Sequence, residues 1–341
     1  NIEILAPAGC KEQLIAAVEA GADAVYFGVK KLNARMGAQN FLLDSLPETM
    51  AFLHKNNVRG YLTLNIDLHQ REINLAAEII EAAAQAKVDA LLIRDPALLE
   101  LMRFFPELEF HFSTQAAVSS SAGMLAAREL GLTRVVLARE LSQAEISAAS
   151  AISGIETEVF VQGALCFSCS GRCLLSSWGG GRSGNRGSCT SPCRVLWTTD
   201  KEHSARPMSM YDLCLLENLN ELQQSGIKSM KIEGRLKSAE WVKKAVSLYK
   251  DARDKQSDAE LLLQQADELG AYSGRKLSPA FFKEIRENIS GESGRPASDN
   301  LTISKKTKKA KSLLLNLQED EKGALLLQLE FEDKQSSLRI P

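Results

Sequence analysis

Seven cysteines are the residues of this 341-residue chain that point most directly to chemistry. An odd total rules out complete disulfide pairing, and the N-terminus lacks a signal-peptide pattern, so we expect a cytoplasmic chain with reduced thiols. Five of the cysteines gather in one segment that is rich in glycine and serine: Cys166, Cys169, Cys173, Cys189 and Cys193. This cluster predicts thiolate chemistry, and a metal centre first of all.

The spacing of the clustered cysteines leaves several kinds of centre open. Four thiolates close in space suit either zinc or an iron–sulfur cluster. Cys166 and Cys169 would form one zinc knuckle, but no second knuckle follows, whereas a glycine-rich backbone offers N–H groups to cluster sulfides. The pattern therefore favours iron–sulfur over zinc. Disulfides rank third and a single nucleophilic cysteine fourth; the nucleophile needs a base, for which His111 is the best-placed histidine.

These residues need a scaffold, and the first 250 or so residues repeat one unit. Short apolar runs alternate with helical patterns, and three helices are followed by a glycine before the next strand, at Gly21, Gly131 and Gly226. The repeat favours an α/β fold of the TIM type, a (β/α)8 barrel over residues 1–252, rather than an open doubly wound sheet. The expected buried strands are 2–5, 24–27, 61–64, 90–93, 109–112, 134–137, 158–161 and 229–232.

Polar side chains lie at or just after the ends of nearly all of these strands. Active sites of such barrels form at the carboxyl ends of the strands, so these side chains are expected to share one pocket. The cysteine-rich loop, residues 162–194, leaves the seventh strand at the same end. We expect Glu233 to be either a general acid/base or an ion-pair partner of Arg235. The candidate pocket residues are Arg35, Asn65, His111, Gln115, Arg139, Glu233 and Arg235.

Charge and hydropathy limit the partners of the chain. The net charge is −2, which excludes a globally basic nucleic-acid-binding protein. No apolar run approaches the ~20 residues of a membrane span. Residues 253–341 are expected to form a small C-terminal α+β appendage that need not be complete, with helices over 257–270 and 278–289 and a hairpin over 312–331. Its lysine run, 304–312, is expected either to contact RNA phosphates or to be a solvated loop.

At these residues the chain resembles the U32 peptidase (collagenase-like) family. The resemblance is carried by several long motifs in the same order along the chain: 5–9 (LAPAG), 21–28 (GADAVYFG), 112–116 (FSTQA), 163–173 (GALCFSCSGRC), 186–194 (RGSCTSPCR) and 231–235 (KIEGR). Despite its name, this family includes oxygen-independent hydroxylases that carry a 4Fe–4S cluster. By position in the motifs, the resemblance implies Cys166, Cys173, Cys189 and Cys193 as ligands, with Cys169 as an additional thiol.

The resemblance also implies substrates. Some members of the family hydroxylate pyrimidines in tRNA or 23S rRNA with prephenate as the hydroxyl source. Prephenate is a dicarboxylate, so Arg35, Arg139, Arg182 and Arg235 are its candidate partners. A flipped base would meet Asn65 and Gln115 and stack on Tyr26 or Trp178.

Two further functions fit the family, that of a U32-type peptidase and that of a cluster-carrying subunit of a hydroxylase complex. The sequence offers no HExxH or G-x-S-x-G motif that would favour the peptidase. It leaves open whether the chain acts alone or as a homo- or hetero-oligomer.

Overall fold

The computed structural model describes residues 2–178, 181–198, 204–255, 264–270, 274–291, 313–319, 325–331 and 334–340. The chain forms two compact units, Asn1–Arg295 and Pro296–Pro341. Within the described residues, no helix is both long and apolar enough to cross a membrane.

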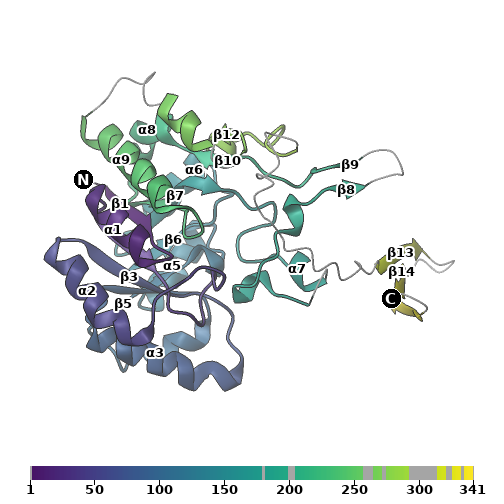
Figure 1. Ribbon diagram of the computed structural model, residues 1–341, viewed down its shortest axis with the longest axis horizontal. Coiled ribbons are helices and arrows are strands. Elements are labelled where there is room, and N and C mark those ends of the chain that lie inside the picture. Colours follow the sequence, from purple (N-terminus) through teal and green to yellow (C-terminus); the bar gives the residue numbers. More distant parts are fainter. Residues whose placement is uncertain are drawn as a thin grey trace. The chain divides into compact units, whose positions relative to one another are not determined.

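The first unit is built on a closed parallel barrel (Figure 1). Closure occurs where β11 pairs in parallel with both β1 and β7. The (β/α)8 fold predicted from the apolar runs is confirmed, and every predicted strand matches an observed one to within two or three residues at each end. The barrel strands in the described residues are β1 (Glu3–Pro7), β2 (Ala24–Phe27), β3 (Arg59–Leu64), β4 (Ala90–Ile93), β5 (Glu109–Phe112), β6 (Arg134–Val136), β7 (Glu156–Ala164) and β11 (Ser229–Ile232).

Helices cover the outside of the barrel and connect its strands (Figure 1). Gly21, Gly131 and Gly226 have φ angles of +83°, +85° and +79°. These left-handed residues end α1, α5 and α8 and turn the chain into the next strand, as the sequence predicts. The longer described helices are α1 (Lys11–Glu19), α2 (Leu46–Lys55), α3 (Ile73–Gln85), α5 (Ser121–Glu129), α6 (Gln143–Ser150), α8 (Leu219–Gln224) and α9 (Ala239–Lys255); α4 (Leu99–Met102) is a single turn.

The barrel unit extends beyond residue 252, where the sequence predicted it to end. Helix α9 continues through that position, and β12 (Leu277–Ser278) pairs in parallel with β10 (Asp212–Cys214), which itself lies antiparallel to β7. This non-local pairing ties residues 274–291 to the barrel. The helix expected over 278–289 is wrong, because the chain there forms β12 and the 3-10 helix η8 (Ala280–Lys283). Of the helix expected over 257–270, the described part, 264–270, is helical.

The second unit contains an antiparallel sheet in the order β13 (Leu313–Glu319), β14 (Leu325–Phe331), β15 (Lys334–Ile340). The predicted hairpin corresponds to β13 and β14, and the sequence missed the third strand. Over the range expected for the appendage, 253–341, the described residues include the helical segment 264–270 as well as these strands, but that helical segment belongs to the first unit. The lysine run lies outside the described residues.

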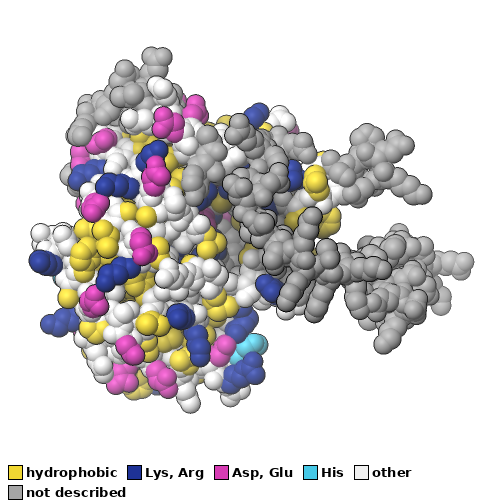
Figure 2. Space-filling model, in the orientation of Figure 1, with side chains coloured by type: hydrophobic (Ala, Val, Ile, Leu, Met, Phe, Trp, Pro, Cys, Tyr) yellow, Lys and Arg dark blue, Asp and Glu magenta, His cyan; other side chains and the backbone are white. Residues whose placement is uncertain are grey.

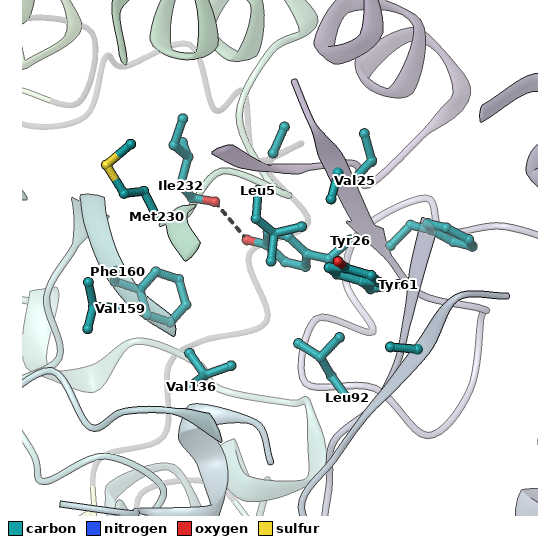
Figure 3. Packing of buried hydrophobic residues seen from close by; sticks show 14 of the residues in the cluster. Leu5, Val25, Tyr26, Tyr61, Leu92, Val136, Val159, Phe160, Met230 and Ile232 are labelled. Carbon is teal, nitrogen blue, oxygen red and sulfur yellow. Dashed lines mark hydrogen bonds between the residues drawn. The ribbon is translucent and has the colours of Figure 1, made fainter. Parts of the chain in front are cut away.

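The inside of the barrel is apolar in its middle and charged toward the amino ends of the strands. Figure 3 shows the apolar part, where Tyr26, Tyr61 and Phe160 meet Leu92 and Val136. Nearer the amino ends of the strands, Glu158 is fully buried. It accepts from Lys231 Nζ at 2.8 Å and from Arg134 Nη1 at 3.3 Å. Arg134 Nη1 also reaches Glu3 Oε1 at 2.6 Å. Each buried charge in this group has a partner, as a low-dielectric interior requires.

Glu158→Gln should lower the free energy of unfolding by about 3–5 kcal/mol, because it leaves Lys231 and Arg134 as buried cations with less compensation. Glu156→Gln is the matched control: its side chain also pairs with Arg134, but it is 48% exposed. The control should cost less than about 1 kcal/mol. Urea unfolding at pH 7 measures both, and equal effects would show that burial of the pair does not matter.

Candidate active site

A pocket lies at the carboxyl ends of the barrel strands. Its walls come from residues at or just after the ends of β2, β3, β5, β6 and β11, together with inward side chains of β4 and β7. This is the end at which barrel enzymes carry their active sites. The described lining residues are Tyr26, Ala34, Arg35, Thr63, Asn65, Leu92, Ser113, Thr114, Gln115, Val136, Arg139, Phe160, Lys231, Glu233 and Arg235.

Most of the candidate residues chosen from the sequence meet in this pocket. Parallel strands deliver their carboxyl ends to one rim, so side chains far apart in the chain converge there. The residues brought together are Arg35, Asn65, Gln115, Arg139, Glu233 and Arg235. Their chemical roles stay predictions.

Glu233 is the electrostatic centre of the pocket. Its two carboxylate oxygens pair with Arg35 and with Arg139, the latter at 2.5 Å between Nη1 and Oε2. Burial alone would raise the pKa of Glu233, but Arg139 and Arg35 outweigh it and hold that pKa at about 2. The carboxylate is therefore ionised at neutral pH, so it cannot supply a proton there. Its partners are these two arginines, and not Arg235 as the sequence suggested.

Arg235 has no carboxylate partner among the described residues, although its side chain is buried. Nη1 donates to Thr63 Oγ1 at 3.2 Å, and Nη2 donates to Asn33 Oδ1 at 3.0 Å and to the amide oxygen of Asn40. Burial lowers the pKa of Arg235 to about 10, so it still carries its charge at neutral pH. A Cβ on Gly28 would lie 2.5 Å from Nη2, which explains why the position needs glycine. Arg235 is therefore a buried cation that donates only to neutral acceptors among the described residues.

The two amide side chains of the pocket are held by their neighbours. Asn65 Oδ1 accepts from the Ala34 N–H at 3.0 Å, and its Nδ2 donates to Ser113 Oγ at 3.1 Å. Gln115 Oε1 accepts from Arg94 Nη1 at 3.1 Å. These contacts fix the loops after β2, β3 and β5 relative to one another.

Lys231 is a pocket residue that sequence reasoning missed. It pairs with Glu158, and its Nζ lies 4.2 Å from the centre of the Tyr26 ring. Burial lowers the pKa of Lys231, and Glu158 acts against this effect. The available signal was a charged residue inside the otherwise apolar strand β11. Thr63, at the end of β3, was missed as well.

His111 does not reach the pocket. It lies within β5, opposite Leu92 and Arg134, and its side chain is buried next to Tyr61, with ring centres 5.3 Å apart. Its Nε2 faces Glu109 Oε2 at 3.3 Å, near the amino end of the strand. The catalytic role suggested for His111 is therefore corrected: the strand register directs it into the barrel interior, away from the strand ends.

Arg182 is also placed differently from the prediction. It lies on the cysteine-rich loop, its side chain is exposed, and it is not among the described residues that line the pocket. Arg182 lies far along the loop from the end of β7 at Ala164, whereas Arg235 follows the end of β11 at Ile232 closely.

The cysteine-rich loop is seated on the pocket rim by close backbone contacts. Gly171 has a φ of +68°, and a Cβ there would lie 2.1 Å from the carbonyl oxygen of Gln115. Gly187, with a φ of +76°, approaches the carbonyl oxygen of Asn33 in the same way. Arg186 anchors the loop further, because its Nη2 donates to Glu72 Oε1 at 2.7 Å. The loop also contains the short helices α7 (Leu175–Trp178), η5 (Gly184–Arg186) and η6 (Pro192–Arg194).

Four thiols of the loop lie within electrostatic range of one another. Loss of hydration is the main reason that the pKa of Cys193 is raised; Arg194 opposes it, and Cys166, Cys189 and Cys173 add to it. The pKa of Arg35 is raised mainly by Glu233, with a smaller contribution from Cys189.

The arrangement of these thiols bears on which kind of metal centre they could hold. Among the described residues, no three Cys, His, Asp or Glu side chains form a group that could hold one metal ion. A four-iron cluster takes one thiolate on each iron, so its ligands stand further apart. The Ser191 N–H donates to Cys189 Sγ at 3.3 Å, the kind of contact that stabilises a ligating sulfur. Cys166, Cys173, Cys189 and Cys193 are the loop residues that could hold a metal centre, and the 4Fe–4S cluster stays a prediction.

Fold and pocket together define a TIM-barrel protein with a thiol-bearing loop at its mouth. The model of peptidase family U32 matches residues 9–292. The tRNA hydroxylation protein P1 of Bacillus subtilis is 35% identical, over 96% of this chain and 81% of that protein. The chain belongs to peptidase family U32.

Further relatives carry different names. The 23S rRNA 5-hydroxycytidine synthase of Escherichia coli is 34% identical, over 81% of this chain and 42% of that protein. The collagenase of Porphyromonas gingivalis is 32% identical, over 74% of this chain and 65% of that protein. Membership of the family therefore leaves the reaction to be argued from the site.

Gly171→Ala should loosen the cysteine-rich loop, because the added Cβ overlaps the Gln115 carbonyl oxygen and the left-handed backbone alone costs about 1–2 kcal/mol. Gly181→Ala is the control, since Gly181 has a φ of +64° and nothing within 4 Å of its Cβ position. Limited proteolysis should cut the loop faster in the first variant than in the second. Identical cleavage rates would show that the close approach does not hold the loop.

Glu233→Gln should destabilise the protein by roughly 3 kcal/mol at pH 7, given a pKa of about 2 against an ordinary value of 4.5. Because the folded-state pKa is depressed, this contribution is complete above pH 4.5 and is lost as the pH falls toward 2. Urea unfolding at pH 7 and pH 3 should therefore show the difference shrinking by more than half. Glu240→Gln, at a side chain 78% exposed, should change stability little at either pH.

Proposed function

We propose that this chain is an RNA hydroxylase: it adds a hydroxyl group to a pyrimidine base of tRNA or 23S rRNA without oxygen, with a 4Fe–4S cluster and with prephenate as the hydroxyl donor. The observation that carries the proposal is a positively charged barrel mouth bordered by four thiols. Relatives named for tRNA hydroxylation and for 5-hydroxycytidine synthesis support the substrate class.

The charge of the pocket favours a dianionic ligand. Its lining contains four cationic side chains and one carboxylate: Arg35, Arg139, Lys231, Arg235 and Glu233. Glu233 offsets two arginines with one charge, and Glu158, behind the wall, offsets Lys231. Arg235 keeps its whole charge, because its acceptors are neutral. A dicarboxylate such as prephenate would supply the missing negative charge, and guanidinium groups recognise carboxylates in a bidentate manner.

The thiols would hold the cluster beside this charge. Cys166, Cys173, Cys189 and Cys193 are its proposed ligands, and Arg35 and Arg139 lie close enough to act on the thiols. When bound, the cluster would activate the substrate in place of an organic redox cofactor. The arginines hold the anionic co-substrate, and Glu233 keeps both guanidinium groups in position.

The target base needs polar contacts and a surface for stacking. The amides of Asn65 and Gln115 line the pocket, as do the hydroxyls of Ser113 and Thr114. Amides and hydroxyls recognise the edges of an unpaired base, which must leave its stack to enter a barrel mouth. Tyr26 lines the inner wall, where its OH donates to the Ile232 carbonyl oxygen at 3.0 Å (Figure 3).

A U32-type peptidase is the second candidate function, which the name of the collagenase relative raises. The described lining contains neither histidine nor cysteine, and the His111 side chain faces Glu109 at the amino end of β5. A nucleophile–base pair of the Cys/His or Ser/His type therefore does not form in the described pocket.

Cys173→Ala should abolish the modification and most of the bound iron, because each ligand holds one iron of the cluster. After anaerobic reconstitution, the wild-type chain should contain about four irons, and Cys169→Ala, the matched control in the same loop, should keep them. Nucleoside analysis of tRNA and 23S rRNA from a strain that lacks the protein should show the loss of a 5-hydroxypyrimidine, restored by wild type and not by Cys173→Ala. An unchanged nucleoside profile together with cleavage of a collagen-type peptide would replace the proposal with the peptidase.

A further inference from the structure

The cysteine-rich loop exposes large apolar side chains that a soluble protein normally covers. Trp178 is 78% exposed, Phe167 52% and Leu174 51%. Trp178, at the end of α7, has the largest exposed fraction of the large hydrophobic residues in the described part of the chain. Exposed apolar patches of this kind mark binding surfaces.

The same loop is basic without any acidic residue. Between Gln162 and Thr199 the sequence has four arginines and no Asp or Glu, although the whole chain has a net charge of −2. On the face of the barrel that Figure 2 shows, by contrast, acidic and basic side chains are interspersed. The loop thus carries a local positive charge in a chain whose net charge is slightly negative.

The four arginines divide into two pairs. Arg186 is engaged with Glu72, and Arg194 donates to the Leu165 carbonyl oxygen at 2.6 Å, so both serve the fold. Arg172 and Arg182 have exposed side chains, and within the described residues neither guanidinium has a hydrogen-bond or ion-pair partner. Two cations are therefore available on the same loop as the exposed aromatic rings.

We propose that this loop is the docking surface for a single-stranded segment of RNA, with bases stacked on Trp178 and Phe167 and phosphates paired with Arg172 and Arg182. Aromatic rings together with arginines bind single strands, whereas the bases of a duplex are already stacked and cannot reach the rings. The absence of acidic residues from the loop selects a polyanion over an ordinary protein partner. This inference rests on the proposed function for the identity of the RNA.

The loop also leads to the pocket. Gly171 touches the backbone of Gln115, and the Ser170 hydroxyl accepts from the Arg139 N–H at 3.2 Å; Gln115 and Arg139 both line the pocket. A strand held by the rings of the loop is therefore attached next to the barrel mouth. Nucleotides beside the target would be bound by the loop while the target base enters the pocket.

Trp178→Ala should weaken binding of a fluorescently labelled single-stranded RNA of about ten nucleotides by about 5- to 100-fold, the effect of losing one stacked base. Trp178→Phe should restore most of the affinity, because it keeps an aromatic face. The anaerobically reconstituted full chain is titrated by fluorescence anisotropy, with circular dichroism to check folding. Phe104→Ala is the control: Phe104 is 64% exposed but lies next to α4 on the barrel.

Arg182→Gln tests the phosphate contact separately. The slope of log Kd against log salt should fall by about 0.7, the value for one phosphate of a single strand, while Trp178→Ala should leave the slope unchanged. Arg103→Gln, at a side chain 69% exposed beside Phe104, should change neither slope nor affinity. Unaltered affinity in Trp178→Ala, or equal binding of a duplex of the same sequence, would refute the docking surface. If the variants change single-strand binding as expected but the protein has no hydroxylase activity, only the proposed function is refuted.

Discussion

Charge burial inside a closed barrel is the constraint on which the rest of this structure depends. A cation in a low-dielectric interior needs a partner, and the barrel supplies partners in two layers. Near the amino ends of the strands, Glu158 and Glu3 compensate Arg134 and Lys231. At the carboxyl ends, Glu233 compensates two arginines, and Arg235 has only neutral acceptors. The fold therefore places more positive than negative charge at the barrel mouth.

The cysteine-rich loop depends on that mouth for its order. It has few apolar residues to bury, and it gains its position from backbone contacts that only glycine permits and from arginines that reach carboxylates and carbonyl oxygens. Because these contacts hold the loop in place, its cysteine and large apolar side chains are not needed to position it. Four of its thiols lie within electrostatic range of one another, and its large apolar side chains stay in solvent. One segment thus combines the proposed cluster site with the proposed RNA surface.

The fold was predictable because buried parallel strands are short and uniformly apolar, and because Gly21, Gly131 and Gly226 mark the turns before them. Much of the pocket followed from one rule, that polar residues after such strands meet at one rim. The errors have a common physical cause. The pairing of β10 with β12 joins residues far apart in sequence, so the boundary expected at residue 252 was wrong. The prediction for His111 was wrong because its side chain packs beside Tyr61 and faces Glu109, deeper in the barrel than the pocket, and such depth is decided by three-dimensional packing.

By itself, the sequence determined the number and order of the barrel strands, the segment that bears the thiols and the set of polar residues at the strand ends, since each of these depends on local composition and spacing. Only the tertiary structure decided how the charges are paired. Glu233 lies two residues from Arg235, yet its partners are Arg35 and Arg139, which reach it across the barrel mouth. Ion pairing depends on distance in space and on the loss of water around each group, and both exist only once the strands have closed into a barrel.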